Sequence, residues 1–294
     1  KGPAPDIAAL ADTPLAEILE SGATLAPCFD VVVLRRSHTL ADGETPIDIA
    51  VDEGEIRAGG RRLPVCEIEL ELRRGSPAAL FALARDLAES VPLTVSGFSK
   101  SERGYRLLAG EEPVAVKQKP GALPAGVTIR DAFRSLARDC LAHLQAPALH
   151  EGRAPEAVHQ SRVALRRLRA ALSLFSAVVR DGERDRVREG LRWLAGALGE
   201  ARDLDVVLSR PVPQEARESL RRRRDDAYAH ALAAASSARA GQVLVETVAW
   251  IEAGEWAREP DLDAPAATFA AALLERRRRK LRSRSRHLRR RSVE

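Results

Sequence analysis

Several residue types are scarce in this chain of 294 residues, and each scarcity excludes a class of protein. Cysteine occurs only at Cys28, Cys66 and Cys140, which lie far apart, form no CxxC pair and are odd in number. Neither a zinc knuckle nor a disulfide framework is therefore expected, and a reducing cytosol suits the chain best. No apolar run approaches the roughly 20 residues that span a bilayer, and no charged leader precedes an apolar core at the amino end. We therefore expect a cytoplasmic protein without membrane insertion.

Methionine is absent altogether, and the chain begins at Lys1. A processed or trimmed fragment would explain the start of the chain. Methionines left out of the recorded sequence would explain the composition, and composition alone does not separate these explanations.

Acidic residues are absent from residues 158–179, the window that carries the most informative pattern in the chain. At 3.6 residues per turn, one face of a helix over this window collects His159, Arg162, Arg166 and Arg169. The neighbouring face collects Leu165, Leu168, Leu172 and Phe175. Forked guanidinium donors at helical pitch suit a row of phosphate oxygens, and aligned like charges repel unless an anion neutralises them. The alternative, a solvated face paired with carboxylates, is weakened by the lack of acids nearby.

The charge of the chain is unevenly distributed, although the formal net charge is only +5. Carboxylates outnumber Lys and Arg before residue 120, whereas arginine-rich runs occupy 221–224, 276–279 and 282–291. This distribution predicts that the second half binds anions. The runs at 221–224 and 276–279 circle a helix, so at most about half of each run shares a face, and most of these side chains are expected to be solvent charge.

The first half has the pattern of strands, at residues 29–34, 47–51, 62–72 and 103–108, interrupted by a helix near 77–90. Within 66–72, a period of two puts Glu67, Glu69 and Glu71 on one face and aliphatic residues on the other. In an ordinary antiparallel sheet this would be a polar outer face.

Neighbouring charges favour a binding site over that alternative. Asp48 and Asp52 share a face of the preceding strand, and Arg35, Lys100 and Arg103 bring cations to strand ends. A barrel built from these strands could gather acids for a divalent metal and bases for phosphates.

Three motifs in order resemble the later part of a CYTH domain, the triphosphate tunnel metalloenzyme family. They are Ile47-Asp-Ile-Ala-Val-Asp52-x-Gly54-x-Ile56, Glu67-Ile-Glu69-Leu-Glu71-Leu and Ser99-Lys100-Ser-Glu-Arg103-Gly-Tyr105, within residues 25–108. The resemblance implies an antiparallel barrel in which acids hold Mg²⁺ or Mn²⁺ and bases hold a triphosphate for hydrolysis. It assigns metal binding to Glu67 and Glu69 with Asp52 as an additional acid near the metal, and triphosphate binding to Arg35, Lys100 and, as a further candidate, Arg103.

The chain departs from this family at its start, because the ExExK strand that opens the family's barrel is not found near Lys1. The polypeptide as written is therefore expected not to close a tunnel, and we expect a metal cofactor and hydrolysis only in a complete protein.

Turn-forming residues between 109 and 126 predict a linker between two domains. Beyond it, apolar residues recur with helical periodicity. The predicted helices are 128–146, 155–180, 183–199, 203–209, 213–238, 240–253 and 265–288, and an antiparallel bundle follows.

The motif His159-Gln-x-Arg162-Val-x-Leu-Arg166-Arg167-Leu-Arg169, followed by Ala201-Arg202-Asp203-Leu-Asp205-Val, resembles the first half of a CHAD domain. The resemblance implies two helical halves that face each other across a basic pore or cleft, and an association with inorganic polyphosphate. A second half should open with another His-x-x-Arg motif near Glu294, where the chain stops, so half of the cleft is expected to be absent.

The residues of this motif leave alternatives open. His159 is either a structural histidine bonded into the bundle or a phosphate donor that binds more strongly once protonated. Arg167 projects about 80° to 100° away from Arg166 around the helix, and it either binds phosphate or is solvated. Arg202 is expected to form ion pairs at a helix junction, where Asp203 caps the next helix, with anion binding as its secondary role.

The sequence thus predicts an α+β protein of two domains. These are a CYTH-like antiparallel β-barrel segment (1–108), a linker (109–126) and a CHAD-like all-α bundle (127–294). The predicted function is binding of inorganic polyphosphate, or another polyphosphorylated anion, by His159, Arg162, Arg166, Arg167, Arg169 and Arg202. The first alternative is a metal-dependent inorganic triphosphatase whose helical domain tethers substrate.

The second alternative is a nucleic-acid-binding protein. No base-recognition motif and no aromatic residue interleaved with the arginine stripe supports it. The three tryptophans, Trp193, Trp250 and Trp256, are expected to be packing residues. The sequence leaves the oligomeric state open.

Overall fold

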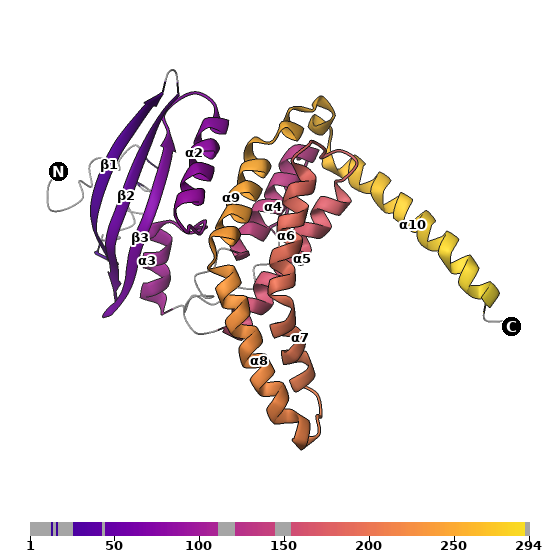
Figure 1. Ribbon diagram of the computed structural model, residues 1–294. Helices are drawn as coiled ribbons and strands as arrows, with labels where there is room; N and C mark the ends of the chain where they lie inside the picture. Colours follow the sequence, from indigo (N-terminus) through magenta and orange to yellow (C-terminus); the bar gives the residue numbers. More distant parts are fainter. Residues whose placement is uncertain are drawn as a thin grey trace.

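The computed structural model describes residues 13, 16, 26–42, 45–110, 121–144 and 154–291. It has a mixed α and β architecture, in which a three-stranded antiparallel sheet stands beside a set of packed helices (Figure 1). We call residues 26–110 the sheet unit and residues 121–291 the helical unit. The predicted boundary at 109–126 lies largely outside the described residues, as does the start of the chain. None of the described helices is both long and apolar enough to cross a bilayer.

The sheet has the order β1-β2-β3, formed by Asp30–Asp42, Thr45–Ala58 and Arg61–Leu72. The strands predicted at 29–34, 47–51 and 62–72 are confirmed, although β1 and β2 are longer than predicted. Strands β2 and β3 are joined by Gly59 and Gly60, whose φ angles of 55° and 76° suit a tight hairpin turn. Among the described residues the sheet is open, so the barrel expected from the sequence is not closed by these three strands.

The strand predicted at 103–108 is wrong, because these residues belong to helix α3, Lys100–Ala109. The Ser99 side chain accepts a hydrogen bond from Glu102 N at 3.1 Å and caps the start of the helix. Gly110, with a φ of 66°, ends it. A pattern of six residues is too short to distinguish a strand from a helix. The caps at Ser99 and Gly110 favour the helix.

The remaining helices agree closely with prediction. They are α2 Pro77–Ser90, α4 Ile129–Leu144, α5 Ala154–Leu174, α6 Arg184–Ala197, α7 Gly199–Leu208, α8 Gln214–Ala235, α9 Ala238–Ala253 and α10 Ala266–Arg291, with the short 3₁₀ turns η3 Glu255–Arg258 and η4 Pro260–Asp263. Two boundaries differ from prediction by more than three residues. Helix α5 ends at Leu174 rather than at residue 180, and α7 begins at Gly199 rather than at residue 203.

The helical unit is built around an aromatic cluster. The Phe133 ring lies 5.3 Å from Phe175 and 5.0 Å from Trp256, and Trp250 completes the group. Trp250 and Trp256 are fully buried, which confirms them as packing residues. Trp193 is half-buried, with the Arg239 guanidinium 4.2 Å from its ring centre.

One carboxylate, that of Asp181, holds this core and the start of α6 together. It accepts hydrogen bonds from the backbone amides of Glu183 at 3.1 Å and Arg184 at 3.0 Å. It also accepts from the Trp250 indole at 2.8 Å and from the Trp256 amide at 3.2 Å. A single side chain therefore satisfies four donors from separate parts of the chain.

The sheet unit packs against the helical unit through α2, which lies between the sheet and α9 (Figure 1). Ala88 of α2 is buried, and Val95, in the segment after α2, packs on the core of the helical unit. The Leu93 carbonyl oxygen lies against Gly241 of α9, where a Cβ would overlap it. Glycine at 241 is thus required by close packing.

We expect Asp181→Ala to lower the free energy of unfolding by about 2–4 kcal/mol, since α6 loses its capping acceptor and the buried Trp250 indole loses its partner. Thermal and denaturant unfolding would measure the loss. Asp185→Ala, which removes an exposed carboxylate one helical turn away, is the control and should change stability by less than about 0.5 kcal/mol. Equal stability of the two variants would contradict the role of Asp181.

Gly241→Ala should destabilise the protein by about 1–3 kcal/mol, because the added methyl group collides with the Leu93 backbone. Gly196→Ala in α6 is the matched control, because a Cβ there meets nothing within 4 Å and alanine favours the helix. The control should therefore be neutral or stabilising. Differential scanning calorimetry compares the two, and an unaltered Gly241→Ala variant would show that the two units are not closely packed at this point.

Candidate functional site

The register of the sheet brings three of the predicted site residues into one row. Arg35 on β1 is paired with Asp52 on β2, which is paired in turn with Glu67 on β3. Glu69 lies on the same face of β3, two residues further along, because side chains alternate between the faces of a strand. The predicted grouping of the strand carboxylates on one face is thus confirmed.

Asp52 is the centre of this group, and its side chain is fully buried. Arg35 donates to it through two nitrogens, with Nε 2.7 Å from Oδ1 and Nη2 2.6 Å from Oδ2. The same Nη2 lies 2.6 Å from Glu69 Oε2. A buried carboxylate is retained only when it is paired in this way. Arg35 acts from the middle of β1, not from a strand end as predicted.

Helix α3 supplies two more cations to the row. Lys100 Nζ lies 2.7 Å from Asp52 Oδ2 and 2.7 Å from Glu69 Oε1, and it also contacts Glu67. Arg103 contacts Glu67 as well. The predicted residues therefore do meet, although Lys100 and Arg103 reach the sheet from a helix. Sequence reasoning placed them on or beside a strand and missed the Ser99 cap that orients them.

The orientation of α3 is fixed by an aromatic contact that the sequence did not indicate. The Phe29 ring lies where a Cβ on Gly104 would be, and it meets the Tyr105 ring edge-on at 5.0 Å. Only glycine at 104 lets the helix approach this closely. The glycine and tyrosine of the third CYTH-like motif thus have a packing role.

We call Asp52, Glu67 and Glu69 the acid cluster. Hydrogen bonding by Arg35 holds the pKa of the Asp52 carboxyl well below its usual range, and a hydrogen bond from Lys100 lowers the pKa of Glu69. Burial lowers the pKa of Lys100, but its hydrogen bonds to the three carboxylates outweigh burial, and the pKa is raised overall. The Asp52 and Glu69 carboxylates are therefore ionised, and the Arg35 and Lys100 cations balance their charge.

The acid cluster has the donor set of a divalent metal site. Each residue offers one carboxylate oxygen, and these oxygens lie within 4.8 Å of one another. Oxygen donors of this kind suit Mg²⁺ or Mn²⁺. The Lys100 ammonium already contacts all three carboxylates, so the geometry accommodates a cation.

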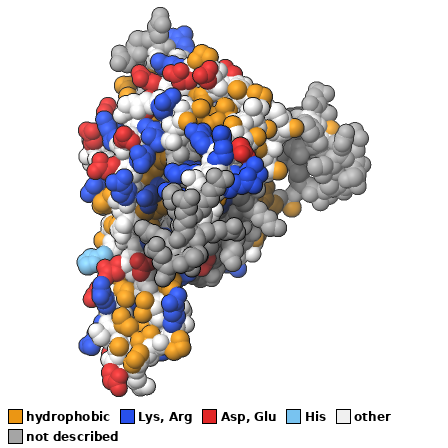
Figure 2. Space-filling view, turned by 90° about the vertical axis from the view of Figure 1, so that its right-hand side faces the viewer, with side chains coloured by type: hydrophobic (Ala, Val, Ile, Leu, Met, Phe, Trp, Pro, Cys, Tyr) orange, Lys and Arg blue, Asp and Glu red, His pale blue; other side chains and the backbone are white. Residues whose placement is uncertain are grey.

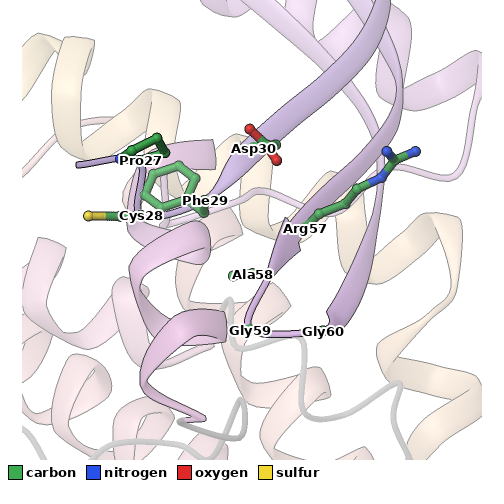
Figure 3. Close-up of a pocket in the computed structure, with 8 residues that line it drawn as sticks. All are labelled: Pro27, Cys28, Phe29, Asp30, Arg57, Ala58, Gly59 and Gly60. Carbon is green, nitrogen blue, oxygen red and sulfur yellow. The ribbon is translucent and has the colours of Figure 1, made fainter.

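A surface pocket of about 230 Å³ lies away from these residues, at one end of the sheet (Figure 3). It is lined by residues preceding and opening β1, by the end of β2 and by the β2–β3 turn, namely Pro27, Cys28, Phe29, Asp30, Arg57, Ala58, Gly59 and Gly60. None of the predicted site residues lines it, and it contributes nothing to the acid cluster.

The second predicted site lies on α5, whose apolar face is buried as expected. Arg166 and Arg169 are exposed, whereas His159, Arg162 and Arg167 are half-buried. Among the described residues, no carboxylate lies within ion-pair distance of Arg166 or Arg169. We call Arg162, Arg166 and Arg169 the α5 stripe. Figure 2 shows Lys and Arg side chains on the face of the molecule that lies on the right in Figure 1.

Ion pairs at α7 and α8 differ from prediction. Asp203 lies inside α7 and does not cap it, because the helix begins four residues earlier at Gly199. Its carboxylate instead lies 3.4 Å from Arg162 Nη2 of α5. Arg202 lies 3.8 Å from Asp205, which confirms part of the predicted pairing.

Sequence reasoning missed two partners of Asp205. Arg224 Nε donates to Asp205 Oδ1 at 2.6 Å, and the Tyr228 hydroxyl donates to Oδ2 at 2.5 Å. Burial, together with the hydrogen bond to Asp205, raises the pKa of Tyr228. The spacing of four residues between Arg224 and Tyr228 could have placed them on one face of α8, but their common partner lies in another helix.

Comparison with known proteins agrees with both resemblances. The CYTH domain family matches residues 4–105, and the CHAD domain family matches residues 135–294. A curated protein from Haemophilus influenzae named inorganic triphosphatase is 34% identical over 84 residues, which are 29% of this chain. The chain spans only 24% of the length of that relative.

A crystal structure of the CHAD domain from the plant Ricinus communis is similar to this chain with a TM-score of 0.49 and 32% sequence identity. The similarity covers 55% of this chain and 57% of that one. The CHAD match extends over more than half of the chain, after the CYTH match. The chain therefore belongs to the CHAD domain family and carries a CYTH domain ahead of its CHAD domain.

Proposed function

We propose that the CHAD domain binds inorganic polyphosphate, or a similar polyphosphorylated anion, through the α5 stripe. The observation that carries this proposal is the exposure of Arg166 and Arg169 without an acidic partner among the described residues. Elsewhere in the helical unit, arginines such as Arg130 and Arg138 are paired with carboxylates.

The geometry of α5 supports a ligand with many charges in a row. Arg162, Arg166 and Arg169 follow one another at successive turns, about 4.5–6 Å apart along the helix axis. Each guanidinium can present a fork of two donors to phosphate oxygens. A polyanion bound along this face would relieve the repulsion between the arginines and release its own counterions, so its affinity depends on salt.

His159 and Arg167 flank the stripe and extend the proposed site. His159 precedes Arg162 on the same face and adds a donor to phosphate when it is protonated. Arg167 lies to the side, near Cys140 of α4. We also place the protein in the cytoplasm, a location supported by its three free cysteines.

Replacing Arg162, Arg166 and Arg169 together by alanine should lower the affinity for long-chain polyphosphate at least tenfold, since three phosphate contacts are lost. The slope of log K against log salt should fall by roughly 2. Isothermal titration calorimetry at several salt concentrations measures both quantities.

The matched control replaces Arg36, Arg62 and Arg74 of the sheet unit by alanine, which removes the same charge from exposed positions elsewhere. This control should bind within about twofold of the unaltered chain. An equal loss of affinity in the α5 variant and in this control would indicate a general effect of charge. That result would contradict binding by the α5 stripe. Displacement by duplex DNA at equal phosphate concentration would instead favour a nucleic-acid-binding protein.

A second function, that of a metal-dependent triphosphatase, is favoured by the acid cluster and by the name of the Haemophilus relative. We propose that β1, β2 and β3 form part of an antiparallel tunnel barrel. Asp52, Glu67 and Glu69 would hold Mg²⁺ or Mn²⁺, and Arg35, Lys100 and Arg103 would bind the triphosphate. The metal, when bound, polarises a phosphoryl oxygen, while the cations balance the charge of the phosphate chain.

Glu67→Gln should abolish Mg²⁺- or Mn²⁺-dependent phosphate release from tripolyphosphate, and it should weaken Mn²⁺ binding measured by electron paramagnetic resonance at least tenfold. Glu71→Gln is the matched control, because Glu71 lies on the same face of β3 outside the acid cluster. It should leave both properties nearly unaltered. Mn²⁺ binding that is equally strong in the two variants would overturn the assignment of the metal site.

A further inference from the structure

We infer that Arg224 of α8 is a polyphosphate-binding residue and that Asp205 and Tyr228 are the positioning residues that aim it. The inference rests on the proposed function of the CHAD domain and extends it. It adds Arg224 to the proposed anion site. It also gives Asp205 and Tyr228 the role of orienting Arg224 without contacting the ligand.

The first step is the arrangement of three arginines along helix α7. The α7 residues Gly199, Arg202 and Asp205 are spaced three residues apart, so they lie in a row on one side of the helix. Arg162 of α5 lies against the first of these, because its Nη1 is 3.1 Å from the place where a Cβ on Gly199 would be. Arg224 of α8 lies against the last, through its bond to Asp205. Arg162, Arg202 and Arg224 therefore border one row of α7 residues.

The second step is the way in which Asp205 holds its partners. It accepts from Arg224 through Nε alone, and Arg202 approaches only through Nη1, at 3.8 Å. Arg224 Nη1 also lies 3.6 Å from Asp225 Oδ1, which leaves Nη2 of Arg224 without an acceptor among the described residues. The Arg224 side chain is 29% exposed and that of Arg202 is 33% exposed, so an anion can reach both.

The third step concerns Tyr228, which keeps Asp205 in place. The tyrosine is buried, and its hydroxyl donates to Asp205 Oδ2 at 2.5 Å. Its ring also lies beneath the Arg224 guanidinium, 4.8 Å away. Asp205 itself is only 12% exposed. A hydrogen bond from a buried hydroxyl fixes the orientation of the Asp205 carboxylate. The carboxylate in turn restricts the orientation of the Arg224 guanidinium that binds it.

The charges of this row are balanced within the protein, and the excess positive charge lies on the α5 stripe beside it. Three carboxylates, Asp203, Asp205 and Asp225, face three guanidinium groups, those of Arg162, Arg202 and Arg224. Arg166 and Arg169 add positive charge that no carboxylate of the described residues meets. The sequence suggested that most of the 221–224 run is solvent charge, and the structure separates Arg224 from that run because it alone binds Asp205.

The test is titration of the full chain with long-chain polyphosphate at several salt concentrations, with variants of α8. Arg224→Ala should weaken binding roughly threefold to tenfold and lower the salt slope by roughly 0.7–0.9, because one phosphate contact is lost. Arg224→Lys, which keeps the charge but not the fork, should recover the slope and only part of the affinity. Arg222→Ala is the matched control, since residue 222 lies about 200° from Arg224 around the helix.

Tyr228→Phe removes only the hydroxyl and distinguishes positioning from folding. It should weaken binding roughly twofold to fivefold without altering the salt slope, because every cation is still present. Thermal unfolding followed by circular dichroism reports whether the variant is folded. A merely structural role would leave the affinity of the folded Tyr228→Phe variant unaltered.

The outcomes separate this inference from the proposed function. Binding that depends on the α5 stripe but is equal in Arg224→Ala and Arg222→Ala would overturn the role of Arg224 and leave the proposed function intact. An unaltered chain that does not bind polyphosphate at all would overturn both. Loss of affinity and slope in Arg224→Ala, with loss of affinity alone in Tyr228→Phe, is the expected result.

Discussion

The guanidinium groups of this protein differ in what neutralises them, and this difference distinguishes one part of the molecule from another. In the sheet unit, Arg35, Lys100 and Arg103 are neutralised by the acid cluster. On α5, Arg166 and Arg169 find no carboxylate among the described residues. Because uncompensated charges at successive turns repel one another, this helix is suited to an external polyanion.

Arginines also hold the helical unit together where they have internal acceptors. Arg134 of α4 donates to the carbonyl of Ile251 at 3.3 Å and to that of Glu252 at 2.9 Å, at the end of α9. Cations at the end of a helix satisfy its free carbonyls and oppose its dipole. Together with the Asp181 carboxylate at the start of α6, these contacts anchor the bundle on which α5 is presented. The same residue type therefore stabilises the fold in one place and is available for binding in another.

The sequence predicted the strands of the acid cluster and nearly every helix, because both depend on local periodicity. The alternation through Glu67 and Glu69 places them on one face whatever the surroundings. The stripe through Arg162, Arg166 and Arg169 likewise follows from helical spacing alone. The segment around Arg103 was assigned wrongly because six residues are too few to separate two periodicities, and the caps at Ser99 and Gly110 were overlooked.

Partners that are distant in the chain could not be predicted in the same way. Nothing in the local pattern connects Asp205 with Tyr228, or Asp52 with Lys100, since these pairs form only when separate helices and strands pack. The residue types, their order and their periodicity thus determined which side chains share a face, and with it the two candidate sites. Only the tertiary structure decided which charges are neutralised and which stay open, because an ion pair depends on distance in space and not on spacing in sequence.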